Sequence, residues 1–437
     1  MTDIADAPAQ TNDPVDEVNA WLQENWDPEL TVAEWWERLG TSGWASPAWP
    51  KDAYGRGLSR SDAVRVGKAI ADFGALGAPG GLGLLLAGPT IAFHGTPEQK
   101  ERYLRDIVTG QKAWCQLFSE PQAGSDLAGL QTKAVKDGDE WIVNGQKVWT
   151  SGGHVADMGM LIARTNPDAP KHQGITWFAM DMHQDGADVR PLKEMTGRAL
   201  FNEVFLTDVR VEDAAIIGGL NNGWAVTNTT LAFERAGLGA GSGSESGGAA
   251  TPGSVAGDLP KRVGDFVRSN RRRGGPGGMS GMHSVIQGIA QSNGKIKDPT
   301  VRQDLMKLYT MNEIARFSGL RLKGLAKEGK DLPGFGNIAK LSMSHILRLS
   351  RDLGLRVLGP QGMLHAYPNQ DREALDASTG NPLAGIITEA ALFAQGPPIY
   401  GGTDQIQRNI IGERVLGLPK EPGPHRDTPF RELPKNG

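Results

Sequence analysis

The hydrophobic pattern of this 437-residue chain changes its period twice, and this change constrains the fold more than any other feature. At 96–110 (TPEQKERYLRDIVTG) the apolar residues share one helical face, and Thr96 and Gln99 form a capping box at its start. From about 118 to 215 the pattern becomes strand-like. Helical spacing returns at 298–327, where an Asp-Pro pair predicts the start of a long helix. The order predicts an α+β protein with a separate sheet region.

The strand-like block carries its own turn signals. Asp137-Gly138 and Asn144-Gly145 are dipeptides typical of tight hairpins, and both lie between apolar runs. Three later runs, MGMLIAR, ITWFAMDM and ALFNEVFLTDVRV, have the length and apolar character of strands. The block therefore predicts a compact antiparallel β domain of roughly 100 residues, which is a common domain size.

These changes of pattern predict how the chain is divided. We expect an N-terminal helical domain at 1–117, a central β domain at 118–225 and a C-terminal helical domain at 226–418. A Gly- and Ser-rich insertion at about 237–281 interrupts the last domain, and it predicts flexible chain around one short helix. The Pro-rich tail at 419–437 is expected to be disordered.

Composition and charge exclude several classes of function. Apolar residues make up 39% and charged residues 22% of the chain, as in globular proteins. The net charge of −4 predicts no nucleic-acid partner. The arginine cluster 271–273 is interpreted as a solvated loop flank, with a phosphate-binding site as the alternative. The single cysteine, Cys115, excludes a disulfide framework and a Cys-rich metal site. The N-terminus resembles no signal or transit peptide and no apolar run is long enough for a bilayer, so we expect a cytoplasmic protein.

Three short motifs carry a resemblance to a known family. They are LFSEPQAGSD (117–126), KVWTSGG (147–153) and IYGGTDQIQR (399–408). In this order and spacing they resemble the acyl-CoA dehydrogenase family, from about residue 20 to 418. The resemblance implies an N-terminal helical domain, a central antiparallel β domain and a C-terminal four-helix bundle. It also implies bound FAD, an acyl-CoA substrate, an electron-transfer flavoprotein as acceptor, and a homodimer or homotetramer joined through the C-terminal helices.

The resemblance implies a role at FAD for individual residues. The small residues before Ser125 also make physical sense, because they leave the backbone open to a phosphate group. The implied cofactor contacts are Phe118 and Ser119 at the flavin ring, Ser125 at the pyrophosphate, Trp149 over one flavin face, Ser151 near flavin N5, and Thr403 and Gln405 from the last motif.

Dehydrogenation of a thioester needs a base, and the last motif lacks the usual one. Gly401 follows Tyr400 where most of the family carries a catalytic Glu. Asp404 is close, but it lies three residues further on and would need a different backbone path. The stretch TTLAFERAGLGAG (229–241) resembles the substrate-domain helix on which a minority of the family, the isovaleryl-CoA and long-chain types, carries its base. We therefore predict that Glu234 is the base.

The substrate contacts follow from the same motifs. Gly401 is expected to keep a backbone N–H for the thioester carbonyl, as an oxyanion-type donor. Arg235, Tyr400 and Ser125 complete the predicted substrate site. The apolar neighbours of Glu234 in the sequence favour an elevated pKa for its carboxyl group.

Several positions depart from the family pattern. Ala290 stands where relatives carry an Arg that reaches the FAD of the neighbouring subunit. Asn293 stands where relatives carry a Phe. Arg356 stands where relatives carry a Gln, and it is the candidate to replace the lost charge. The insertion predicts either a wider acyl pocket or a surface for a partner subunit. Besides the dehydrogenase, two alternatives stay open: a flavin oxidase or monooxygenase of the same fold, and a non-catalytic subunit of a hetero-oligomer.

Overall fold

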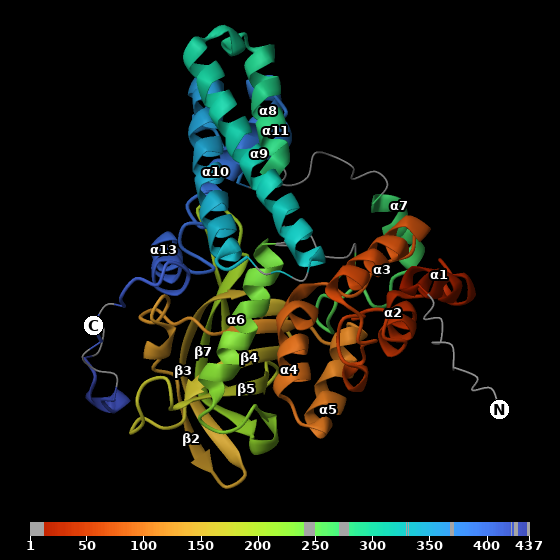
Figure 1. Cartoon of the computed structure of the whole chain (residues 1–437), viewed down its shortest axis with the longest axis vertical. Helices are drawn as coiled ribbons and strands as arrows, with labels where there is room; N and C mark the ends of the chain where they lie inside the picture. The colour runs from red at the N-terminus through yellow and green to blue at the C-terminus, as the bar shows by residue number, and fades with distance from the viewer. Residues whose placement is uncertain are drawn as a thin grey trace, which may run out of the picture.

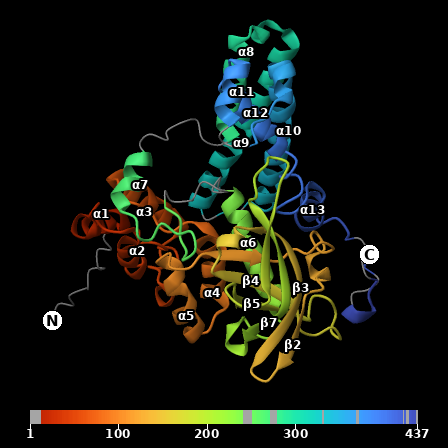
Figure 2. The same cartoon turned by 180° about the vertical axis from the view of Figure 1, so that it is seen from behind.

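The molecule consists of two helical regions and one sheet. The computed structural model describes residues 13–239, 250–270, 279–328, 330, 332–367, 371–420, 422–423 and 427–434. The N-terminal helices pack beside the sheet, and the C-terminal helices form a bundle that projects from it (Figure 1, Figure 2). The predicted α+β class is therefore confirmed.

The N-terminal region is helical, as its periodicity predicts. Its helices are α1 (Pro14–Asn25), α2 (Val32–Thr41), α3 (Arg60–Phe73), a π-helical turn η2 (Gly83–Ala87), α4 (Gly88–His94) and α5 (Pro97–Val108). The capping box of Thr96 and Gln99 is present at the start of α5. Trp35 and Trp36 of α2 are fully buried between these helices, so aromatic side chains supply much of this core.

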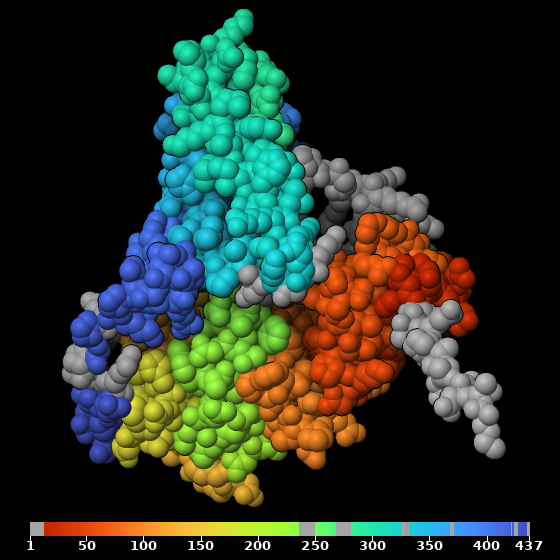
Figure 3. Space-filling view, viewed as in Figure 1, coloured from red at the N-terminus to blue at the C-terminus, as the bar shows by residue number. Residues whose placement is uncertain are grey.

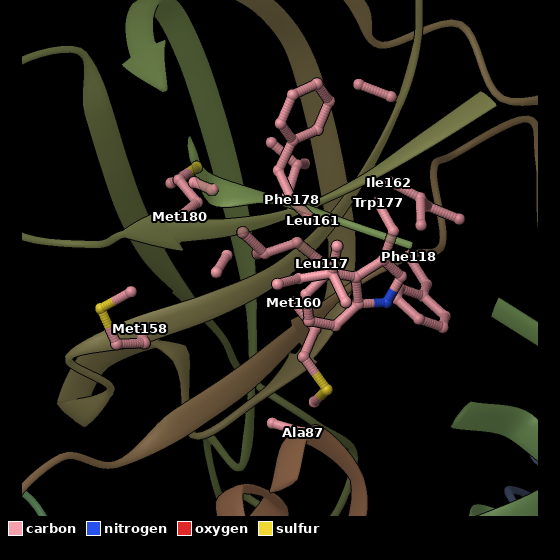
Figure 4. Close-up of a cluster of buried hydrophobic side chains, with 14 of the residues drawn as sticks. Ala87, Leu117, Phe118, Met158, Met160, Leu161, Ile162, Trp177, Phe178 and Met180 are labelled. Carbon is pink, nitrogen blue, oxygen red and sulfur yellow. The ribbon is translucent and has the colours of Figure 1, made fainter. Parts of the chain in front are cut away.

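The central region is an eight-stranded mixed sheet in the order β6-β7-β3-β2-β4-β5-β8, with β1 paired to β4. The strands are β1 (Trp114–Leu117), β2 (Lys133–Asp137), β3 (Glu140–Ser151), β4 (Met158–Arg164), β5 (Ile175–Asp181), β6 (Ala187–Leu192), β7 (Phe201–Glu212) and β8 (Ile216–Ile217). Most pairs are antiparallel, but β4 runs parallel to both β1 and β2. Figure 4 shows the buried cluster along β1, β4 and β5, where Phe118, Met160 and Trp177 pack together.

One of the two predicted hairpin turns is wrong. Gly138 and Asp139 connect β2 to β3 directly after Asp137, but Asn144-Gly145 lies inside β3 at a shift of register against β7. A Cβ atom on Gly145 would come within 2.3 Å of the Thr132 hydroxyl, so glycine permits a close approach of neighbouring strands. The Asn144 amide bonds Asp208 on β7, which makes this a bulge and not a turn.

The C-terminal region begins with α6 (Gly223–Gly239), which lies across the sheet against β5, η2 and α4. The bundle consists of α8 (Met279–Ser292), α9 (Pro299–Lys327), α10 (Phe335–Leu358) and α12 (Ala384–Phe393), with the short α11 (Arg372–Thr379) beside α12. The chain then forms α13 (Asp404–Ile410) against α10. In Figure 3 the light-green surface around α6 lies where the orange N-terminal helices, the yellow sheet residues and the cyan bundle meet.

Parts of the expected flexible segments are packed. Residues 250–270, within the insertion, include α7 (Val263–Asn270), so the expected short helix is present. This segment pairs with the start of α2, where the Val32 N–H donates to the Lys261 carbonyl at 2.8 Å. In the tail, the Phe430 ring lies 3.7 Å from the Arg164 guanidinium, so residues 427–434 differ from the expected disorder. The arginine cluster 271–273 lies outside the described residues.

Candidate active site

The residues that follow β1 (Phe118 and Ser119) are bonded to β3 at Lys147 and Val148, and these four residues are called the frame. The Val148 N–H on β3 donates to the Ser119 carbonyl just after β1 at 2.9 Å, and the Lys147 ammonium donates to the Phe118 carbonyl at 3.1 Å. The Phe118 ring is buried in the core shown in Figure 4, whereas the Ser119 hydroxyl has no hydrogen-bond partner among the described residues. The predicted residues Phe118 and Ser119 are thus fixed next to the end of β3.

A buried ion pair holds this frame. Lys147 and Glu120 are almost fully buried, and their charged atoms lie 2.8 Å apart. The Glu120 carboxylate also accepts the backbone N–H groups of Gln131 and Thr132. Burial alone would raise the pKa of Glu120, but the Lys147 charge and these donors hold it below its ordinary value.

Trp149 and Ser151 lie at the exposed end of β3. The Trp149 backbone is left-handed, with φ of 61°, inside a shift of register that follows Lys147. Its indole is 61% exposed and makes an edge contact with the Phe201 ring. A strained backbone that presents a large aromatic face to solvent indicates a binding role for that face. Ser151 is exposed at the last position of the strand.

Ser125 lies on the exposed loop that follows the frame. The neighbouring Gly124 has open space around it, since an added Cβ atom would meet nothing within 4 Å. The loop is held at its far side, where Lys171 bonds Asp126 at 2.7 Å and the Arg164 guanidinium donates to the Ala128 carbonyl at 2.6 Å. The loop is therefore anchored but leaves its small residues accessible.

Glu234 lies on α6 and faces the same frame. Its side chain is half-buried and accepts a hydrogen bond from the Gln116 amide on β1 at 3.4 Å. Burial raises the pKa of Glu234, and this hydrogen bond and the nearby charge of Arg235 only partly oppose the rise. For Arg235, burial lowers the pKa of the guanidinium, the charge of Glu234 partly opposes this change, and the charge of Arg414 adds to it.

The loop with Tyr400 and Gly401 precedes α13. Gly401 has a left-handed backbone with φ of 63°, and its carbonyl accepts from the Gln407 amide at 2.9 Å. Burial raises the pKa of the Tyr400 hydroxyl. The Thr403 hydroxyl accepts the Ile406 N–H and so caps α13. The predicted cofactor residue Gln405 is exposed on the first turn of this helix.

Asp404 forms buried ion pairs with two residues of α10. It is buried and its carboxylate lies 2.9 Å from Arg348 and 3.5 Å from Lys340, both on α10. The Lys340 ammonium also donates to the Pro397 carbonyl at 2.6 Å. The two cations and the peptide before Tyr400 are thus tied together through Asp404, so this carboxylate has a structural role.

Arg356 is not brought to the other predicted residues. It forms an ion pair with Asp304 on α9 and donates to the Thr300 carbonyl. It lies sixteen residues after Lys340 on α10, which corresponds to roughly 24 Å along the helix axis. Ala290 is buried in the bundle core.

Several residues around the site could not be predicted from the motifs. Gln116 next to Glu234, the pair of Lys147 and Glu120, and Gln407 behind Gly401 meet their partners across separate elements. The only signal in the sequence was their position within or just before the quoted motifs. A surface pocket lined by Phe93, His94, Trp141 and Leu220, among others, contains none of the predicted site residues.

Other kinds of site find no support in the described part of the chain. Its His, Cys, Asp and Glu side chains form no cluster that could hold a metal ion. None of its helices combines the length and the apolar character that a membrane span requires.

Comparisons with known proteins identify the family of the chain. Models of the N-terminal, middle and C-terminal domains of acyl-CoA dehydrogenase match residues 11–111, 115–209 and 282–416. The fold and the matched domains define an oxidoreductase. The chain belongs to the acyl-CoA dehydrogenase family.

Three similar proteins show how closely the chain is related to known members. The acyl-CoA dehydrogenase IpdE1 of Mycobacterium tuberculosis is 33% identical over 388 residues, which is 89% of this chain and 88% of that protein. The ChsE4-ChsE5 complex from Mycobacterium tuberculosis superposes with a TM-score of 0.66 at 27% identity, over 96% of this chain and 100% of the matched one. A variant of the Tcur3481-Tcur3483 steroid ACAD superposes with a TM-score of 0.65 at 25% identity, over 95% of this chain and 100% of the matched one.

Proposed function

We propose that this chain is an FAD-dependent acyl-CoA dehydrogenase that forms a trans-2-enoyl-CoA, with Glu234 as its base. The state of the Glu234 carboxylate carries the proposal. It is half-buried, it forms no ion pair with any described residue, and burial raises its pKa. A base that removes a weakly acidic α-proton near neutral pH needs these properties.

The described residues fit an FAD cofactor. The exposed indole of Trp149 offers a flat aromatic face, and the hydroxyls of Ser119 and Ser151 are free to meet polar atoms of a flavin ring beside it. The open backbone at Gly124 and Ser125 leaves space for a phosphate group. When bound, FAD would supply the acceptor for the hydride that leaves the β-carbon of the substrate.

The remaining predicted contacts would act in different ways. Phe118 has its ring in the core, so it would hold the strand next to the flavin and not stack on it. Thr403 and Gln405 lie at the start of α13, where the exposed side-chain amide of Gln405 is available to a polar ligand. Arg356 is paired within its own bundle, so a contact with FAD would require the cofactor of a partner subunit.

The proton transfer would involve Glu234 and a donor to the thioester carbonyl. The α C–H bond of the substrate breaks and an O–H bond forms on the Glu234 carboxylate. The Gly401 N–H is the proposed donor to the carbonyl oxygen, on which negative charge develops. Leu231 and Phe233 pack α6 against the core and limit water around the base, and Arg235 and Tyr400 are proposed substrate contacts.

We also propose a bulky polycyclic acyl group and an oligomeric enzyme. The word steroid in the name of one similar structure and the paired subunits in another support this direction. Ala290 is uncharged and buried, so it cannot replace the Arg with which relatives reach the FAD of a neighbouring subunit. This favours a partner chain that completes the FAD site. A homodimer or homotetramer is the alternative assembly, and an electron-transfer flavoprotein is the proposed acceptor.

The test uses the visible spectrum of the purified protein with acyl-CoA thioesters under anaerobic conditions. We expect a flavin band that bleaches with a polycyclic thioester, and a loss of about 10²- to 10⁴-fold in reduction rate for Glu234→Gln. Glu203→Gln is the matched control, because Glu203 also accepts from a glutamine, Gln146, but lies on β7. Full activity of Glu234→Gln would overturn the assignment.

Two other results would redirect the proposal. A colourless preparation that turns yellow only with a partner chain would identify a subunit with an incomplete cofactor site. Oxygen consumption without an added acceptor would identify a flavin oxidase or monooxygenase of the same fold.

A further inference from the structure

Gln116 is placed by β1 directly beneath the proposed base. The residue pairs with Met160 of β4 in the sheet register, and Trp114, two positions earlier, packs against η2 on the same face of the strand. Helix α6 passes over this face, and the Gln116 Nε2 atom lies 3.4 Å from the Glu234 Oε2 atom. This is the one side-chain hydrogen bond to the Glu234 carboxylate among the described residues.

Few other charged groups face Glu234. Its neighbour Arg235 acts on it, and Arg414, from the turn after α13, acts on Arg235. On α4, the His94 imidazole bonds Thr229, one and a half turns away from Glu234 on α6.

Among the described residues, the other elements that pack against α6 add no charged contact to Glu234. The turn η2 has no titratable side chain. On α10, Lys340 and Arg348 both pair with Asp404, and Lys340 also donates to the Pro397 carbonyl. On β5, Asp181 lies at the exposed end of the strand, where it accepts the His183 N–H. Gln116 is therefore the neutral polar group in position to stabilise the Glu234 side chain.

We propose that Gln116 is a positioning residue for Glu234 that stays hydrogen-bonded to it both before and after proton transfer. The inference rests on the proposed role of Glu234 as base. A carboxylate accepts hydrogen bonds only, whereas a carboxylic acid also donates one. A primary amide can meet both needs: its NH₂ donates to the carboxylate, and after a half-turn its oxygen accepts the acid proton. The terminal amide torsion is soft, so this turn meets a low barrier.

The hydrogen bond also has a predictable effect on the acidity of Glu234. Burial favours the neutral acid, and a donor from Gln116 favours the charged form. The amide therefore limits how far burial raises the pKa of Glu234, so the base stays partly ionised at neutral pH. A leucine at position 116 would remove this donor, whereas a glutamate would replace it with a like charge.

The test compares Gln116→Leu and Gln116→Glu in the complete enzyme. We expect the acidic limb of the kcat/KM profile to move up by about one pH unit for Gln116→Leu, and further for Gln116→Glu. At pH values above this limb, the rate of Gln116→Leu should recover to within tenfold of the parent. Gln146→Leu, which removes the analogous donor to Glu203 on the sheet, should leave the limb in place.

A second readout does not depend on activity. Infrared difference spectra give the carboxylic acid band of Glu234, identified by its loss in Glu234→Gln, and its titration midpoint should rise in Gln116→Leu. An unchanged midpoint, or a uniform rate loss with an unmoved acidic limb, would overturn the proposal and leave Gln116 a packing residue. If Glu234→Gln were fully active, the proposed function would fail, but the band would still report whether Gln116 controls this carboxyl group.

Discussion

Glu120 and Glu234 are two carboxylates beside the same strand, β1, but they have opposite environments. Glu120 has a buried ammonium at 2.8 Å and two backbone donors. Glu234 has one long hydrogen bond from Gln116 and no ion pair with a described residue. The pKa of Glu120 is therefore lowered and that of Glu234 is raised, although burial by itself raises the pKa of both carboxyl groups.

The comparison shows that burial alone does not make a base. Burial raises the pKa of either group, and the partners then decide whether the carboxylate stays ionised. A fully paired carboxylate such as Glu120 holds backbone segments together, whereas a sparsely paired one such as Glu234 can accept a proton. Asp404 belongs with Glu120, because Arg348 and Lys340 both surround it.

The largest change in stability is expected from Lys147→Met. It leaves the Glu120 carboxylate buried without its counter-charge, which should lower the free energy of unfolding by about 3–5 kcal/mol. Urea unfolding measures the loss, and the double variant Lys147→Met/Glu120→Gln should recover part of it. Lys136→Met is the control, because the pair of Lys136 and Asp213 is exposed. A loss below about 1 kcal/mol would mean that the pair does not hold the frame.

Asp404→Asn should reduce stability less than Lys147→Met does. It should leave the acidic limb of the kcat/KM pH profile at the same pH. Removing this charge leaves the buried Lys340 with only the Pro397 carbonyl as its partner, so we expect a loss of about 1–3 kcal/mol in the free energy of urea unfolding. The rate is expected to fall, because Asp404 anchors the segment before Gly401, but the acidic limb of kcat/KM should not move. Asp352→Asn, at an exposed carboxylate, is the control. If Asp404→Asn lost the acidic limb of the kcat/KM profile, Asp404 and not Glu234 would be the base.

The two glutamates should affect stability in opposite directions as pH changes. The raised pKa of Glu234 contributes stability below the ordinary glutamate pKa, and this contribution is lost as pH rises through the raised value. The lowered pKa of Glu120 contributes stability above the ordinary value, and it is lost as pH falls through the lowered one. Free energies of unfolding measured across these pH values should lose the contribution of Glu234 in Glu234→Gln and the contribution of Glu120 in Glu120→Gln. The same slope in both variants would contradict the comparison.

The smallest effect is expected from Arg356→Ala. Its pair with Asp304 is exposed on the surface of the bundle, so the loss should be about 0.2–1 kcal/mol, measured by thermal unfolding of the single chain. A loss as large as that of Lys147→Met would mean that exposure is a poor guide to the strength of these pairs.

Local patterns predicted most of the elements. The capping box of Thr96 and Gln99 identified the start of α5, because its signal depends on residues only three positions apart. The tight turn at Asp137-Gly138 is equally local. Asn144-Gly145 carries the same turn signal, but Asp208 of β7 and Thr132 meet it from distant positions and hold it inside a strand. The predicted hairpin failed for this reason.

The sequence by itself determined the α+β order, the family and the residues in each motif, because these depend on local spacing and residue type. It also offered Glu234 and Asp404 as possible bases. The tertiary structure decided their environments, since the partners Gln116, Arg348 and Lys340 come from other elements. The acidity of a carboxylate depends on its burial and on the charges and donors within a few ångströms, and only the folded chain brings those groups together.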